Sequence, residues 1–158
     1  MSVRVQTGDF DISEEIAHLR IDNPKVGAVA CFVGTVRDMS GNKKISAMEL
    51  EHYAGMTESV LRELVDTAKK NWNIFDALII HRVGKLEPTD QIVLVAVTSA
   101  HRQEAFSACE FLVDKLKISA PLWKKEYFSG NSKKARWVTQ KASDEKAGEK
   151  WDSLKSER

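Results

Sequence analysis

The sequence has few cysteines and no long apolar run, and both absences narrow the class of protein. The two cysteines, Cys31 and Cys109, lie in apolar stretches and form no CxxC pair, which argues against a disulfide scaffold and a thiolate zinc site. Both are expected to be core residues rather than nucleophiles, because burial in apolar surroundings raises the pKa of a thiol. No apolar run approaches the ~20 residues that a membrane-spanning helix needs, and the N-terminus lacks the apolar segment of a secretory signal. We therefore expect a cytoplasmic protein without a membrane partner.

Motifs that bind nucleotides or metals are also missing. There is no Walker loop and no GxGxxG, HExxH or GxSxG pattern, and the four histidines lack the spacing of metal ligands. We expect neither a metal site nor a resident cofactor.

The net charge is +1. Residues 1–123 hold 14 basic and 17 acidic side chains, and residues 124–158 hold 10 basic and six acidic ones. A nucleic-acid-binding domain would carry a stronger basic excess.

Hydrophobic patterning predicts an irregular alternation of strands and helices. Nearly continuous β-branched runs at 26–36, 75–83 and 91–99 predict buried strands, and the short gap between the last two predicts an antiparallel pair. The remaining expectations are helices at 11–19, 57–72 and 101–118, strands at 46–53, 122–128 and 135–138, and packing roles for Trp123 and Trp137. This order predicts an α+β fold rather than a doubly wound sheet, with one domain over 1–140 and a charged tail over 141–158.

Basic residues gather at the ends of the expected elements. Arg37 follows one buried strand, and the His101-Arg102 pair follows another at the start of a helix, where free N–H groups and the helix dipole attract anions. Further cations are Lys115, Lys117, Lys124, Lys125 and Arg136. Ordinary explanations exist, since lysines near a helix C-terminus offset the dipole and Lys124 and Lys125 would face opposite sides of a strand. The residues alone therefore indicate an anion-binding cluster and do not identify the anion.

At these same residues the chain resembles the large, catalytic subunit of molybdopterin synthase. The matching segments are FVGTVRD (32–38), LEHYAGMTE (50–58), IIHRVGKLEPTD (79–90), VAVTSAHRQEAF (95–106), DKLKISAPLWKKE (114–126) and RWV (136–138). With their spacing they cover most of residues 26–138. The combination of HYAGM, HRVG, TSAHR and KISAPLWKKE in this order is specific, whereas any one piece alone would be a weak signal.

The resemblance implies a fold, an activity and partners. Members of that family have an α/β hammerhead fold with additional antiparallel strands. They are sulfurtransferases of molybdenum cofactor biosynthesis, which insert the two dithiolene sulfurs of molybdopterin into cyclic pyranopterin monophosphate. The sulfur arrives as a thiocarboxylate on the C-terminal Gly-Gly tail of a small ubiquitin-like subunit, and the assembly is a heterotetramer around a homodimer of the large subunit. Residues 1–140 would then be a single catalytic domain.

Residue by residue, the resemblance also implies a site. Lys117 resembles the family's catalytic lysine, and Lys124 matches its second essential lysine. The implied substrate-binding residues are Thr35, Val36, Arg37, His101, Arg102, Lys125, Glu126 and Arg136, with only a backbone contact implied at Thr35 and a weaker match at Arg136. A substrate with a phosphate and a donor with an anionic tail suit a basic pocket. Delivery of sulfur by the partner also explains why this chain shows no nucleophile.

The implied mechanism gives the cations different tasks. Lys117, near the terminal carbonyl of the donor, would transfer a proton or polarise the thiocarboxylate as sulfur leaves. Lys124 would stabilise charge on the pterin, while Arg37 and the His101-Arg102 pair would hold the phosphate. Two other interpretations stay open: a non-catalytic docking module for a small ubiquitin-like protein, and an RNA-binding α+β domain that uses the basic C-terminal stretch. The acidic balance of residues 1–123 counts against RNA binding.

Overall fold

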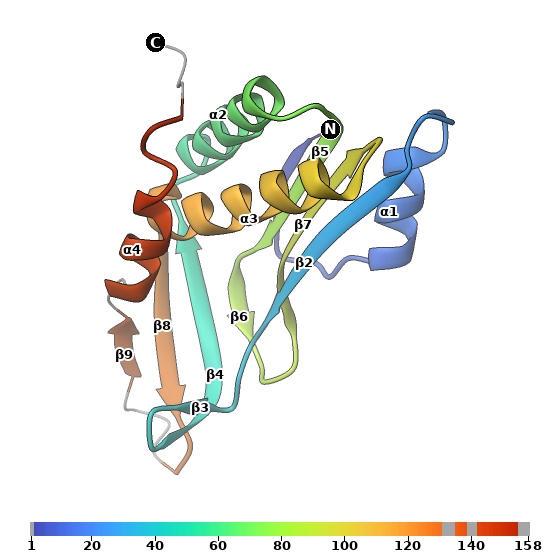
Figure 1. The fold of residues 1–158 in the computed structure, drawn as a ribbon. Coiled ribbons are helices and arrows are strands. Elements are labelled where there is room, and N and C mark those ends of the chain that lie inside the picture. The colour runs from blue at the N-terminus through green and yellow to red at the C-terminus, as the bar shows by residue number, and fades with distance from the viewer. Residues whose placement is uncertain (1, 131–134, 139–141, 155–158) are drawn as a thin grey trace.

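Two β-sheets organise the fold, which Figure 1 shows as a ribbon. The structure is a computed structural model, and it describes residues 2–130, 135–138 and 142–154. The first sheet has four strands in the order β1-β5-β7-β2. Their bounds are β1 Val3–Gln6, β5 Ile74–Arg82, β7 Gln91–Ser99 and β2 Ala28–Thr35. β1 is parallel to β5, whereas the β5–β7 and β7–β2 pairs are antiparallel, so the predicted antiparallel pair is confirmed.

The second sheet is antiparallel and lies beside the first in Figure 1. Its strands follow the order β3-β4-β8-β9, and β6 pairs with β4 as well. Their bounds are β3 Met39–Ser40, β4 Lys43–His52, β8 Leu122–Phe128, β9 Ala135–Val138 and β6 Gly84–Leu86. Because β6 follows β5 after a single residue and then pairs with β4, it ties the two sheets together.

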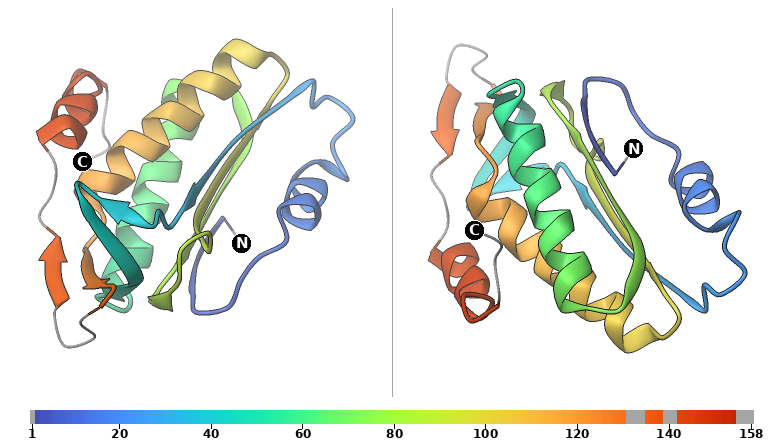
Figure 2. Two further views of the ribbon diagram at one scale, coloured as in Figure 1. Left: turned by 90° about the horizontal axis from the view of Figure 1, so that it is seen from below. Right: turned by 90° about the horizontal axis from the view of Figure 1, so that it is seen from above.

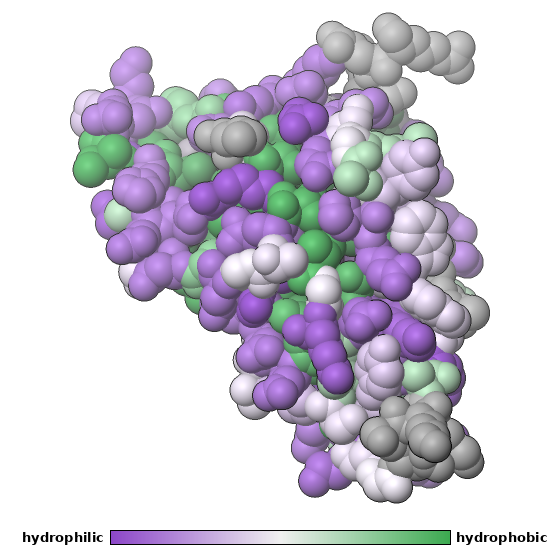
Figure 3. Space-filling view, turned by 180° about the vertical axis from the view of Figure 1, so that it is seen from behind, coloured by the Kyte–Doolittle hydropathy of each residue, from purple (hydrophilic) through white to green (hydrophobic). Residues whose placement is uncertain are grey.

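Helices cover the two faces of the first sheet unequally, as the views of Figure 2 show. α2 (Met56–Asn71) and α3 (Arg102–Ser119) pack on one face, and α1 (Ile12–Arg20) packs on the other. Successive side chains of β7 point alternately into these two layers. Val93, Val95 and Val97 belong to the core cluster under α2 and α3, while Leu94 and Ala96 belong to the cluster under α1. From behind, apolar residues form a broken band among hydrophilic ones (Figure 3).

The segment expected as a charged tail contains a helix that packs against α3. This helix, α4 (Ala142–Glu149), approaches α3 closely at Gly148, where an added Cβ would lie 2.3 Å from Cδ1 of Ile118. Just beyond it, the Trp151 ring lies 5.5 Å from Trp72 and 5.7 Å from Phe111, measured between ring centroids. Its indole N–H donates to Asp114 at 2.8 Å. These contacts anchor residues 142–154 on the main body of the chain.

Three expectations about single side chains are wrong. Cys31 is exposed rather than in the core, because it lies on β2, an edge strand of the first sheet. Trp123 and Trp137 are 49% and 51% exposed rather than packed. Both tryptophans lie on strands of the second sheet, on the face opposite to that of the buried Leu50. Cys109 is buried, as predicted.

We expect the substitution Trp151→Ala to release residues 142–154 from α3 without unfolding the sheets. The loss of the indole's ring contacts and hydrogen bond should lower the free energy of unfolding of this segment by about 2–3 kcal/mol. Limited proteolysis should then cut within 142–154 faster, while the far-ultraviolet spectrum is retained. Trp123→Ala, which removes an exposed ring, is the matched control. Equal cleavage rates in the two variants would contradict the anchoring role of Trp151.

Candidate active site

Arg37 is placed by the residue that precedes it. Thr35 ends β2, and Val36 is 3% exposed, with its side chain in the main core cluster. The backbone N–H of Val36 donates to the carbonyl of Asp90 at 2.9 Å, and its own carbonyl accepts from Thr89 N–H at 2.8 Å. Arg37 follows this anchored residue with an exposed side chain. The predicted position just past a strand is therefore correct, but the strand, expected to be buried, is a partly exposed edge strand.

His101 and Arg102 lie at the opposite end of the same strand pair. The β2–β7 register joins Ala28 to Ser99 at one end and Thr35 to Gln91 at the other. At ~3.3 Å per residue, an eight-residue strand separates its two ends by roughly 23 Å. His101 is the N-cap residue of α3, and its backbone N–H donates to Oγ of Ser99. One chain therefore does not bring Arg37 together with the His101-Arg102 pair.

Lys117 also lies far from that pair, in the last turn of α3. It follows Arg102 by 15 residues, a rise of roughly 22 Å along a helix. The connection from α3 to β8 is held at Pro121, whose carbonyl accepts from Oγ1 of Thr57 at 3.2 Å and from the N–H of Tyr53 at 3.4 Å. These contacts hold the start of β8 against the segment that joins β4 to α2.

The side chains of Lys124 and Lys125 leave β8 on opposite faces, as predicted. Lys124 is paired in register with Leu50, which is 2% exposed in the core cluster, so it shares the inner face. Lys125 is paired with Glu49 on the outer face. There its Nζ lies 5.5 Å from the ring of Tyr127 and 5.5 Å from the ring of Trp137. Only Lys124 therefore faces the interior between the sheets.

Glu126 and Arg136 form a polar cluster with Ser40. Glu126 is 5% exposed, and one of its oxygens accepts from Oγ of Ser40 at 3.4 Å. Its other oxygen lies 3.6 Å from Nη2 of Arg136, which donates to Oγ of Ser40 at 2.9 Å. These contacts join β3, β8 and β9, so both residues have a structural task in addition to the implied one.

Among the described residues, Arg37, Arg102 and Lys117 have no side-chain hydrogen bond or ion pair. All three are exposed. Their charges are therefore not neutralised by carboxylates in the described part of the chain. An anionic ligand could approach any of them without displacing an internal partner.

His81 is a buried histidine that the sequence did not assign to the site. It is 3% exposed on β5, and its Nδ1 lies 2.8 Å from the carbonyl of Arg82. Burial, with smaller contributions from the nearby charges of Lys124 and His52, lowers the pKa of His81 to about 4. The hydrogen bond to the carbonyl requires a proton on Nδ1, so Nε2 is unprotonated. A neutral imidazole thus lies near Lys124.

The part of the chain that the structure describes shows no reactive thiol at Cys109, no metal site and no membrane-spanning helix. Burial raises the pKa of the Cys109 thiol to about 12, which leaves it unreactive as a nucleophile. Residues 2–130, 135–138 and 142–154 contain no group of three His, Cys, Asp or Glu side chains arranged to hold a metal ion. In the same residues, no helix has the length and apolar character to span a membrane.

Comparison with known proteins identifies the family. Residues 5–119 match the family model described as MoaE protein, so the chain belongs to the MoaE family. It is 56% identical to the molybdopterin synthase catalytic subunit of Ralstonia nicotianae over 150 residues, which are 95% of this chain and 84% of that protein. The solved structure of molybdopterin cofactor biosynthesis protein E from Burkholderia multivorans has a TM-score of 0.80 at 49% identity and covers 98% of both chains.

A more distant structure shares only the fold. It is a protein–protein complex of subunits 1 and 2 of molybdopterin-converting factor from Helicobacter pylori, with a TM-score of 0.73 at 19% identity. The match covers 89% of this chain and 92% of that chain. The α+β fold that the order of the elements predicted is confirmed by the solved structures of the family.

We expect His81→Asn to weaken the pH dependence of stability. The folded pKa of about 4 lies below the ~6.5 of a free histidine, so the unfolded chain takes up this proton first as the pH falls. The neutral His81 contributes its full stabilisation of the folded state above about pH 6.5, and this stabilisation is lost as the pH falls toward 4. By about pH 5 the loss in the free energy of unfolding is on the order of 2 kcal/mol. Melting temperatures measured from about pH 7 to about pH 5 should fall less for His81→Asn than for the unsubstituted chain.

The exposed His18 supplies the control for this experiment. His18→Asn should leave the slope of melting temperature against pH unchanged. The same slope in His81→Asn and in the unsubstituted chain would contradict a buried, neutral His81.

Proposed function

We propose that this chain is the catalytic subunit of a molybdopterin synthase, which transfers sulfur to cyclic pyranopterin monophosphate to form the dithiolene of molybdopterin. The observation that carries the proposal is its similarity, over nearly its whole length, to the Ralstonia nicotianae catalytic subunit. The exposed cations Arg37, Arg102 and Lys117, which have no side-chain partner among the described residues, suit a phosphorylated substrate. The buried, unreactive Cys109 is compatible with sulfur that arrives on a partner.

The sulfur donor in this proposal is a small ubiquitin-like subunit with a C-terminal Gly-Gly thiocarboxylate. The Helicobacter pylori structure of the same fold is a complex of two subunits of molybdopterin-converting factor, which supports a two-subunit assembly. A thiocarboxylate must survive until it reaches the site. We therefore place the reaction in the cytoplasm, where the free cysteines of this chain would also stay reduced.

A second copy of this chain completes the site. Arg37 and the His101-Arg102 pair lie at opposite ends of β2 and β7, so one phosphate cannot contact all three within one copy. β2 is an edge strand of its sheet. If two copies meet along β2 about a twofold axis, their strands run antiparallel, and Arg37 of one copy comes beside the His101-Arg102 pair of the other. This gives a homodimer with two equivalent sites, each of which can bind one small subunit in a heterotetramer.

Within each site we assign the residues separate tasks. Arg37, His101 and Arg102 bind the phosphate, Val36 and the backbone of Thr35 line the same end of β2, and Lys124 stabilises charge that develops on the pterin. Lys117 polarises the thiocarboxylate carbonyl or transfers a proton as the carbon–sulfur bond of the donor breaks. Lys125, Glu126 and Arg136 contribute through the second sheet, where the contacts of Glu126 with Arg136 fix their positions.

We expect Lys117→Ala to lower the rate of sulfur transfer at least about 100-fold, because it removes the group that acts on the donor carbonyl. The assay combines the purified chain, a thiocarboxylated small partner and cyclic pyranopterin monophosphate, and it detects molybdopterin as its fluorescent oxidised derivative. Lys115→Ala is the matched control, since Lys115 pairs with Asp152 at 2.7 Å on the same helix. Full turnover by Lys117→Ala would show that this lysine has no catalytic task.

The same assay separates the alternatives for the unsubstituted chain. Product that depends on all three components supports the enzyme. A chain that binds the small partner without forming product would be a docking module. A chain that binds neither the partner nor the substrate would overturn the proposed function.

A site shared between two copies makes a prediction about mixed dimers. A purified dimer with Arg37→Ala in one copy and Arg102→Ala in the other keeps one intact site, so it should retain about half of the normal activity. A dimer that pairs an unsubstituted copy with a copy carrying both substitutions has a defect in each site and should be nearly inactive. The opposite pattern would mean that each site lies within one chain.

A further inference from the structure

The turn between β6 and β7 has an unusual backbone. Asp90 N–H donates to the carbonyl of Glu87 at 3.0 Å, and a carboxylate oxygen of Asp90 accepts from Glu87 N–H at 2.8 Å. Thr89 has φ of 77° and is the one non-glycine residue with positive φ in the described part of the chain. A positive φ at the third position, after Pro88 at the second, fits a turn of type II, which favours glycine at the third position. A β-branched residue in this conformation is strained, so the surrounding contacts must hold it.

The strained residue contacts the strand that leads to Arg37. Thr89 N–H donates to the carbonyl of Val36, and Val36 N–H donates to the carbonyl of Asp90. Val36 thus makes two backbone hydrogen bonds with adjacent turn residues: it accepts one from Thr89 and donates one to Asp90. Both bonds lie beyond the β-bulge between Gly34 and Thr35, where the regular β2–β7 register shifts. Where the regular hydrogen bonding between β2 and β7 ends, the turn therefore supplies the backbone hydrogen bonds that hold the end of β2.

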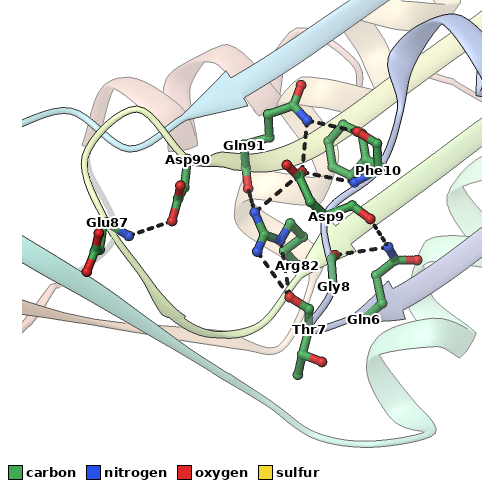
Figure 4. A network of polar contacts seen from close by, with 9 residues as sticks. All are labelled: Gln6, Thr7, Gly8, Asp9, Phe10, Arg82, Glu87, Asp90 and Gln91. Carbon is green, nitrogen blue, oxygen red and sulfur yellow. Dashed lines mark hydrogen bonds and ion pairs between the residues drawn. The ribbon is translucent and has the colours of Figure 1, made fainter.

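A partly buried arginine holds the other side of this turn, as Figure 4 shows. The Arg82 side chain is 12% exposed, and its Nη1 donates to the carbonyl of Gln91 at 3.1 Å. The Gln91 amide donates to Asp9 Oδ1 at 2.8 Å and to the carbonyl of Phe10 at 3.0 Å. The hydrogen bond from Gln91 is the main cause that lowers the pKa of Asp9. The residue after the turn is thereby fixed to β5 and to the N-terminal loop.

We propose that the Glu87–Asp90 turn is a positioning element for Arg37, which fixes the backbone from which its guanidinium reaches the substrate phosphate. The proposal rests on the phosphate-binding role given to Arg37 under the proposed function. Arg37 itself has no side-chain partner among the described residues. Its position is therefore set through Val36, and Val36 is set by the turn.

The test loosens the turn without touching Arg37. Asp90→Ala removes the carboxylate that closes the turn on Glu87, and we expect it to raise KM for cyclic pyranopterin monophosphate about five- to tenfold. Asp90→Asn keeps an oxygen acceptor and should restore most of the affinity. Asp11→Ala is the matched control. It removes a carboxylate that accepts a backbone N–H, from Glu14 at 3.0 Å, at the start of α1 on the other face of the sheet, and it should leave KM unchanged.

A double-mutant cycle then separates positioning from general stability. If the turn acts through Arg37, Asp90→Ala should raise KM in the unsubstituted chain and have no further effect in the Arg37→Ala background. An equal rise of KM in both backgrounds would overturn the proposal while leaving the proposed function intact. If Arg37→Ala alone leaves KM unchanged, the phosphate-binding role of Arg37 is wrong, and the positioning role falls with it.

Discussion

The antiparallel pairing of β5 with β7 is the interaction on which the other elements depend. β7 is buried against helices on both faces, with Val95 packed toward α3 and Leu94 toward α1. Each part of the candidate site begins at an end of this pair. The turn that holds Val36 precedes β7, the N-cap His101 follows it, and β6 carries the end of β5 into the second sheet. The distances between the site's cations are therefore set by the length of a rigid strand.

Much of this frame could be predicted from local sequence, because a strand covered on both faces must be apolar at nearly every position. The run at 91–99 satisfies that rule, and period-two alternation correctly separated Lys124 from Lys125. The docking of residues 142–154 could not be predicted in the same way. It depends on Trp72, Phe111 and Trp151 meeting from three distant segments, while the local composition around Trp151 is charged.

The candidate site was predictable as a set of residues and not as an arrangement. Arg37 and His101 were each placed correctly at an element end, but their separation follows from strand register, which no local pattern reveals. His81 shows the same limit. A histidine within an apolar strand is typical of a satisfied core residue, and no local pattern shows that the end of β5, which continues into β6 and so to β4, lies near Lys124. The positive φ of Thr89 could not be predicted from the sequence either, because it follows from the turn and not from the residue type.

The attachment of the C-terminal segment to α3 combines two interactions that respond oppositely to dissolved salt. Lys115 pairs with Asp152 and Lys150 with Glu110, both at the surface, where a screening length of about 8 Å at physiological ionic strength weakens such pairs. The aromatic contacts of Trp151 are apolar, and salts such as sulfate strengthen apolar burial. Changes in ionic strength thus act on the two interactions in opposite directions. The attachment at the end of α3 that carries Lys117 therefore changes little with ionic strength, although most of the neighbouring segment is charged or polar.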